Sequence, residues 1–246
     1  MRLSLFEFED QPWFPDVLRD YQTGFIGFTA GLGKLYDTLK TMPLLTEVRQ
    51  VTDLASGAGT PAIEVTEQMR KNGGTLLLTD KFPNKTFAAA AEIHPGVSYA
   101  ASPTDVMKHC LPAGELYTMF NAFHHFTFRE KADILRKISA RGGKVLITEP
   151  LQPNVTTFLK VAVATLIGPF LLTPFIRPLT LSRVFFTYLL PVGVFVTFWD
   201  GMASVFRAVS KREYLRLRDI LKKEGIDIEY GTLSSRSGPV TYLRFR

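Results

Sequence analysis

Several features that would assign the chain to common protein classes are missing from its sequence. Only one of its 246 residues is a cysteine, Cys110, which excludes an intrachain disulfide and a multi-cysteine zinc site and favours a reducing, cytoplasmic compartment. The first residues carry acids where a signal peptide would need an apolar run, so no secreted precursor is expected. With 46% hydrophobic and 21% charged residues, the chain is too apolar to be disordered, and its length suits one large domain or a domain with an insertion.

Acidic residues are scarce in the last two fifths of the chain. Residues 1–150 carry 16 basic and 17 acidic side chains, whereas residues 151–246 carry 13 basic and 6 acidic ones, a net charge of +7. A basic surface can bind nucleic acid or an anionic membrane. Because this basic excess lies beside the most apolar stretch of the sequence, we expect a membrane surface and no nucleic acid as the partner.

Short apolar runs alternate with helix-like segments between residues 48 and 149. The expected strands are 48–55, 75–79, 97–101, 116–120 and 144–148, and the expected helices are 60–71, 83–93 and 129–140. This alternation predicts βαβ units and a parallel sheet. A basic helix at 211–224 and strands at 226–233 and 239–245 follow, and the short SSRSG stretch between these strands favours an antiparallel hairpin.

Residues 151–209 interrupt the alternation with two uncharged runs of 16 residues, 161–176 and 184–199. As a helix, each run would extend only about 24 Å, short of the roughly 30 Å of a bilayer core, so two full membrane spans are not expected. A helical hairpin that dips into one leaflet, covers an active site or packs against a second copy is expected instead, and an enlarged soluble core is the alternative. The expected organisation is a helical N-terminal cap (1–47), a Rossmann-like core (48–150), the apolar insertion (151–209) and a C-terminal part that completes the core (210–246).

The stretch VTDLASGAGTPA suggests a cradle for a nucleotide-like ligand. Asp53 ends the first expected strand, and Gly57 and Gly59 lie in the turn before the next helix. Glycine lets the backbone approach a ligand closely, and a helix N-terminus offers free N–H groups. Asp80 ends the next strand, where it could accept hydrogen bonds from a ribose. The glycine spacing also satisfies the dinucleotide fingerprint, which leaves a nicotinamide-dependent oxidoreductase as one alternative and an ordinary tight turn as another.

DLASGAG resembles the first motif of the class I methyltransferases that use S-adenosylmethionine (SAM), with Ala55 in place of the first glycine. The resemblance covers residues 48–149 and 211–246, including the closing antiparallel strand pair. It implies an α/β fold with a Rossmann-like, mostly parallel sheet and SAM as the cofactor. An acid at the position of Asp53 is typical of these enzymes, whereas dinucleotide sites usually keep an apolar residue there.

The resemblance also implies roles for individual residues around the cofactor. Ser56, Gly57 and Gly59 would approach the methionine portion of SAM, and Asp53 would orient the turn and the cofactor's amino group. The remaining candidates are Asp80 for the ribose, Phe82 and Asp105 for the adenine, and Asn121 at the end of the fourth strand. Asp105 has an alternative role as an acid at a helix N-terminus.

Candidates for catalysis follow the fourth and fifth strands, because the carboxyl ends of parallel strands form the reacting edge of such sheets. His124 and His125 are candidate general bases, since an imidazole titrates near neutrality. Their alternative is a structural role, with one ring packed and the other capping a helix or meeting solvent. We expect no metal site, because adjacent histidines normally diverge in direction and His94 and His109 have no ligand spacing to them.

Four further residues are candidates for contact with the acceptor. Phe123 and Glu149 follow the fourth and fifth strands, and Tyr188 and Asp200 belong to the insertion. Glu149 has an alternative role as a strand-end acid, and Asp200 as a polar boundary of a helix.

Three longer stretches are similar to a group of bacterial class I methyltransferases. They are YTMFNAFHHFTFREKADIL, TPFIRPLTLSRVFFTYLLPVGVFVTFWDG and PVTYLRFR. The sequence therefore predicts a SAM-dependent methyltransferase for a small, lipophilic acceptor, attached peripherally or monotopically to the inner face of a membrane. A homo-oligomer formed through the insertion is a further expectation. The alternative function is a non-catalytic membrane-docking or assembly protein that retains the fold.

Overall fold

The computed structural model describes residues 5–83 and 85–245, and the chain forms two compact units. The sheet unit comprises residues 30–150 and 210–246, and the insertion unit comprises Leu151–Val209 together with the residues before Ala30. The expected N-terminal cap is thus divided between the two units. Its second half belongs to the sheet unit because Tyr36, Leu39 and Leu44 are buried in the core of that unit.

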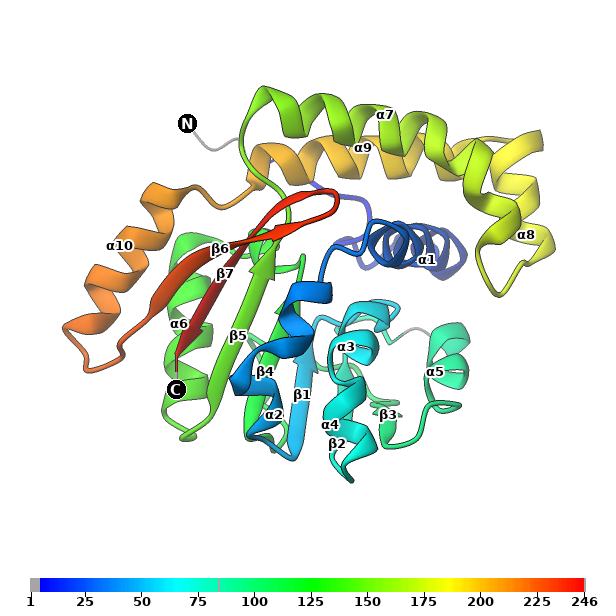
Figure 1. The fold of residues 1–246 in the computed structure, drawn as a ribbon. Coiled ribbons are helices and arrows are strands. Elements are labelled where there is room, and N and C mark those ends of the chain that lie inside the picture. The colour runs from blue at the N-terminus through cyan, green and yellow to red at the C-terminus, as the bar shows by residue number, and fades with distance from the viewer. Residues whose placement is uncertain (1–4, 84, 246) are drawn as a thin grey trace. The chain divides into compact units, whose positions relative to one another are not determined.

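The sheet unit is built on one seven-stranded sheet with the order β3-β2-β1-β4-β5-β7-β6 (Figure 1). The strands are β1 (Gln50–Leu54), β2 (Thr75–Thr79), β3 (Val97–Tyr99), β4 (Leu116–Phe120), β5 (Lys144–Glu149), β6 (Glu229–Ser235) and β7 (Gly238–Phe245). The first five strands are parallel, and β7 pairs antiparallel with both β5 and β6. The predicted fold class and its closing antiparallel hairpin are confirmed.

Short helices connect the strands of the sheet unit. They are η1 (Asp37–Thr41), α2 (Pro43–Thr46), α3 (Thr60–Val65), α4 (Glu67–Lys71), α5 (Lys85–Ala91), η2 (Phe123–His125), α6 (Phe128–Ser139) and α10 (Lys211–Lys222). The helix expected over 60–71 is divided at Thr66, whose hydroxyl donates to the carbonyl of Ala62. Helix α6 begins where Thr127 and Glu130 form a capping box, each side chain accepting from the other's backbone N–H.

Helices α6 and α10 are joined by a buried ion pair. Lys131 is fully buried on α6, and its Nζ donates to Glu213 of α10 at 2.7 Å. Arg136 and Glu224 form a second, more exposed link between the same two segments. These links fix α10 against the part of the chain that leads into β5.

The insertion unit is entirely helical in its regular structure. It contains most of α1 (Asp16–Leu32), α7 (Val155–Leu172), η3 (Thr173–Phe175), α8 (Leu181–Val184), the π-helical turn η4 (Phe185–Leu189) and α9 (Val192–Arg207). Helices α7 and α9 lie side by side and antiparallel (Figure 1), since Phe158 packs against Phe206 and Thr165 against Gly201. Two glycines allow close packing on α1: an added Cβ would lie 3.0 Å from the Phe25 ring at Gly168 and 2.7 Å from the Tyr21 ring at Gly193.

The helices of the insertion are longer than the uncharged runs predicted. Because α7 begins at Val155 and continues through Pro169 into η3, it forms a segment of 21 residues, about 31 Å long. This segment is long and apolar enough to cross a bilayer by length and composition, contrary to the expectation from the 16-residue runs. The pair formed by 181–189 and 192–207 also passes this test, but it is bent by 80°.

Candidate functional site

The carboxyl ends of the parallel strands bring the predicted site residues of the sheet unit to one edge. Asp53 on β1 is level with Leu78 on β2 and Thr118 on β4, and Phe120 on β4 is level with Thr148 on β5. Asp80 follows β2, Asn121 follows β4 and Glu149 ends β5. These three residues therefore lie at the same edge of the sheet. This edge is where α/β sheets of this kind bind ligands.

The turn between β1 and α3 has the conformation that its glycines permit. Gly57 and Gly59 have φ values of 52° and 74°, and a Cβ added at Gly59 would lie only 2.5 Å from a methyl group of Leu78. Ala55 also has a positive φ, 53°, at the position where the methyltransferase motif has its first glycine. The backbone of the motif is thus retained although the residue type has changed, and Ala55 bears conformational strain.

Replacement of Ala55 by glycine is expected to stabilise the sheet unit by about 1 kcal/mol, because glycine adopts positive φ values without a Cβ clash. Chemical denaturation of Ala55→Gly beside the wild-type protein measures this gain. A matched Ala101→Gly change in an exposed loop should give no such gain. Equal or lower stability of Ala55→Gly would show that the turn carries no strain at this position.

Asp80, which follows β2, and Tyr99, which ends β3, hold the glycine turn in place. The carboxylate of Asp80 accepts hydrogen bonds from the backbone N–H groups of Gly57 and Phe82, both at 2.8 Å. The hydroxyl of Tyr99 donates to the carbonyl of Gly57 at 2.8 Å. Asp80 therefore shapes the turn directly, in addition to the predicted contact with a ribose. The sequence did not predict this role of Tyr99, because a tyrosine at the end of a strand gives no sign that its hydroxyl contacts the turn.

Asp53 is buried beneath the turn. Its Oδ1 accepts a hydrogen bond from the hydroxyl of Thr118 at 2.5 Å, and its backbone carbonyl accepts from Thr79. Burial raises the pKa of Asp53 to about 7, and the bond from Thr118 opposes this shift only in part. Asp53 thus links β1 to both neighbouring strands, which suits its predicted role in orienting the turn.

The raised pKa of Asp53 predicts a particular pH dependence of stability. The unfolded chain loses this proton near pH 3.8 and the folded protein near pH 7, so the folded state binds more protons in between, and stability falls as pH rises through that window. The Asp53→Asn variant keeps an acceptor for Thr118 but has no proton to lose. Its stability relative to wild type should therefore increase between pH 5 and pH 8 in urea denaturation. The exposed Glu92→Gln change serves as the control, and parallel profiles for Asp53→Asn and wild type would contradict the assignment.

His124 and Glu149 form a buried pair. Nδ1 of His124 lies 2.9 Å from Oε2 of Glu149, and the backbone N–H of His124 donates to Oε1 at 3.0 Å. Burial alone would raise the pKa of Glu149, but the adjacent His124 ring, its hydrogen bonds and the His125 ring together hold that pKa below 4.5. An ionised carboxylate can only accept, so Nδ1 of His124 carries a proton. The sequence placed both residues at one edge without indicating that they pair.

The rings of His124 and His125 lie close together, with centroids 4.4 Å apart. The expectation that adjacent histidines diverge was wrong, because they lie in the tight turn η2 and not in a strand. His124 is buried, whereas His125 is half-buried. The two histidines therefore differ in burial.

Asn121 follows β4 in the left-handed region, with a φ of 53°. Its Oδ1 is buried and has no hydrogen-bond partner among the described residues. A buried acceptor of this kind favours a ligand with a donor group. Phe82 is half-buried after β2, with Lys81 above its ring.

The carboxylate of Asp105 accepts from the backbone N–H of Met107 at 2.9 Å. This bond closes a turn and does not begin a helix, so the alternative role of Asp105 as an acid at a helix N-terminus is wrong.

The candidate acceptor contacts other than Glu149 have structural partners. Phe123 is fully buried in the sheet unit, with the Lys131 ammonium 5.5 Å from its ring. In the insertion unit, the half-exposed Tyr188 donates from its hydroxyl to the carbonyl of Phe170.

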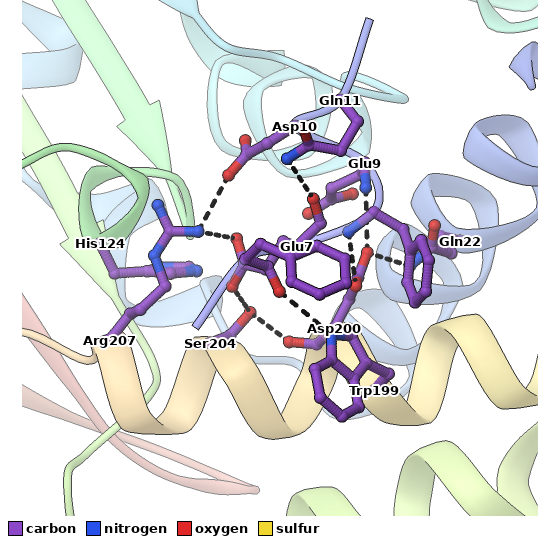
Figure 2. A network of polar contacts seen from close by, with 12 residues as sticks. Glu7, Glu9, Asp10, Gln11, Gln22, His124, Trp199, Asp200, Ser204 and Arg207 are labelled. Carbon is purple, nitrogen blue, oxygen red and sulfur yellow. Dashed lines mark hydrogen bonds and ion pairs between the residues drawn. The ribbon is translucent and has the colours of Figure 1, made fainter. Parts of the chain in front are cut away.

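Asp200 lies inside α9, so its alternative role as a polar boundary of a helix is wrong. It is buried, and its carboxylate accepts from the backbone N–H groups of Phe8 and Glu9 and from the Gln22 side chain (Figure 2). Two turns further along α9, Arg207 donates to Glu7 and Asp10 (Figure 2). Burial raises the pKa of Asp200 to about 6. This network attaches the N-terminal segment to α9, so its acids are structural in the insertion unit.

Solved structures of other proteins have a similar fold. No protein-family model matches the sequence, and no curated protein does. The plantazolicin methyltransferase BpumL, solved with S-adenosylhomocysteine (SAH), has a TM-score of 0.56 at 10% identity, covering 96% of this chain and 91% of that one. An O-methyltransferase family 2 protein from Planctomyces limnophilus, solved with apigenin, has a TM-score of 0.55 at 16% identity and 92% coverage of this chain. Human N-acetylserotonin methyltransferase, solved with SAM, has a TM-score of 0.53 at 15% identity and 89% coverage.

The sheet order, the antiparallel β7 and these neighbours define the Rossmann-like fold of class I SAM-dependent methyltransferases. The chain spans 61% of the length of the Planctomyces protein and 55% of the human enzyme.

Proposed function

We propose that the protein is a SAM-dependent methyltransferase that acts on a small, lipophilic acceptor at or near a membrane. The observation that carries the proposal is the turn between β1 and α3, held by Asp80 and Tyr99 at the carboxyl edge of a methyltransferase fold. The fit to SAM rests on three features of this edge: positive φ values that bring backbone close to a ligand, a strand-end acid after β2, and the buried Oδ1 of Asn121. Ser56, Gly57 and Gly59 would line the methionine portion, and Asp80 would accept from the ribose.

When bound, SAM supplies an electrophilic methyl group on a sulfonium. The protein's contribution is to position the acceptor, exclude water and remove a proton from an acceptor O–H or N–H group. His124 is suited to the last task, because Glu149 holds its Nδ1–H and orients its ring. As Nε2 takes the proton, the adjacent carboxylate stabilises the imidazolium. The acceptor's proton would thus pass to Nε2 of His124, and the acceptor would take the methyl group from the sulfonium, whose S–C bond breaks to leave SAH.

A lipophilic acceptor is supported by the composition of the insertion unit. Its helices expose many large apolar side chains, among them Leu159, Leu171 and Leu189. The location we propose is the cytoplasmic face of a membrane, where an apolar acceptor is concentrated. The exposed Cys110 suits a reducing compartment.

Calorimetry with SAH and with NADH tests the cofactor, and transfer of labelled methyl from SAM to a lipid extract tests the reaction. We expect binding of SAH, no binding of NADH, and a labelled product in the apolar fraction. Binding of NADH alone would overturn the proposal. Binding of SAH without transfer to any extract would favour the non-catalytic membrane-docking or assembly role.

A further inference from the structure

Helix α7 presents a continuous apolar face to solvent. Its exposed large side chains recur every three or four residues, which places them on one side of a helix. We call this surface the α7 outer face; it consists of Val155, Leu159, Val163, Leu166, Ile167, Phe170, Leu171 and Phe175. The face follows the full length of the 21-residue helical segment.

The opposite side of α7 is equally apolar, but it is packed. Thr165 and Val161 contact Gly201 of α9, and Gly168 contacts the ring of Phe25 on α1. A helix that is apolar on all sides is normally covered on all sides. The inner side of α7 is covered by α9 and α1. The outer face is exposed among the described residues, and an apolar surface of this kind marks a site where a partner binds.

The charges beside the outer face indicate which partner it is. Between residues 151 and 209 the exposed charged side chains include Lys160 and Arg177, and the only acid, Asp200, is buried. Lys160 lies on the exposed side of α7, and Arg177 lies two residues beyond the end of the 21-residue helical segment. Lysine and arginine at the edges of an apolar surface reach anionic headgroups while the apolar side chains enter the acyl region. A membrane surface with anionic lipid therefore complements this face in both polarity and charge.

Chain connectivity excludes a single crossing of the bilayer. The insertion leaves the sheet after β5 and returns through α10 to β6 and β7, and β7 pairs with β5. Both ends of the insertion therefore lie on the same side of any membrane.

A second crossing would need the bent segments 181–189 and 192–207, which include the buried Asp200 with its three hydrogen bonds and Arg207 with its two carboxylates. Charged side chains at that depth are strongly unfavourable. An interfacial position of α7 avoids this cost.

We propose that the α7 outer face inserts into the headgroup–acyl boundary of an anionic bilayer, with α7 parallel to the membrane plane. The attachment is monotopic and reversible. It deepens the proposed function by naming the surface from which a lipophilic acceptor would be taken. The docking itself requires no methyl transfer, so the two can fail separately.

Flotation of the full-length protein with preformed vesicles tests the docking. We compare vesicles of phosphatidylcholine alone with vesicles that also contain phosphatidylglycerol, at low and high salt. The wild-type protein should float with both kinds, at least tenfold more strongly with the anionic ones at low salt. The Leu159→Glu/Leu171→Glu variant should lose at least tenfold of its binding to anionic vesicles.

A matched variant, Leu32→Glu/Ile93→Glu, places the same charges on exposed apolar residues of the sheet unit and should float like the wild type. An unchanged circular dichroism spectrum and thermal melt show that each variant is folded. Wild-type protein that stays in the bottom fraction with all vesicles, or an α7 variant that floats normally, would overturn the proposal. A wild-type dimer that does not float and that the α7 variant separates into monomers would also overturn it, in favour of a second copy on this face.

Discussion

The His124→Gln variant is expected to transfer methyl groups roughly 100-fold more slowly than the wild-type protein, with its affinity for SAH unchanged. Glutamine keeps a polar side chain of similar length but cannot take up a proton. The loss should appear in kcat, because the His124 ring acts on the proton of a bound acceptor. Transfer of labelled methyl from SAM to a lipid extract measures the rate, and calorimetry measures the SAH affinity.

Two further variants separate catalysis from positioning. His94→Gln changes an exposed histidine elsewhere in the sheet unit and should leave the rate unchanged. Glu149→Gln removes the charge that holds Nδ1 of His124, so we expect kcat to fall while SAH affinity and the KM for the acceptor change little. If His124→Gln and His125→Gln each lower the rate less than about tenfold, positioning and exclusion of water account for the reaction without a base.

Changes in the glycine turn, or in the acid that holds it, should weaken the binding of the cofactor. Gly57→Val places a branched side chain at a φ of 52°, and Asp80→Ala removes the acceptor for the backbone N–H groups of Gly57 and Phe82. Each variant is expected to bind SAH at least tenfold more weakly, about 1.4 kcal/mol. Calorimetric titration with SAH gives the affinities directly.

The control for both changes is Glu92→Ala, which removes an exposed acid elsewhere in the sheet unit. Circular dichroism and a thermal melt should show that the variants are folded. If folded Gly57→Val and Asp80→Ala both bind SAH as tightly as the wild type, the turn is not the cofactor site.

Much of the sheet unit could be predicted because its elements have strong local signals. Strands β2 and β4 begin and end where their apolar runs begin and end, and β5 differs by one residue. The short loop after β6 correctly indicated an antiparallel hairpin. Long-range packing decides the place of residues 30–47, which join the sheet unit through buried residues such as Leu39 and Leu44.

The candidate site was predictable as a location but not as a set of contacts. Strand ends identified Asp53, Asp80 and Glu149, because parallel strands end at one edge. The pairing of Glu149 with His124 depends on the tight turn η2, which no periodic pattern indicates. The hydrogen bond from Tyr99 to Gly57 joins residues 42 apart in the chain, and spacing alone does not reveal such a contact.

The hydrogen bonds of Asp200 have a consequence for biosynthesis. They join residues up to 192 positions apart, so the segment around Phe8 leaves the ribosome long before its partner helix exists. At a synthesis rate of about 5–20 residues per second, the delay is roughly 10–40 s. Helix α7 also emerges before α9, and until then the side of α7 that packs on α9 is uncovered. The insertion unit can therefore complete its fold only after α9 has left the ribosome.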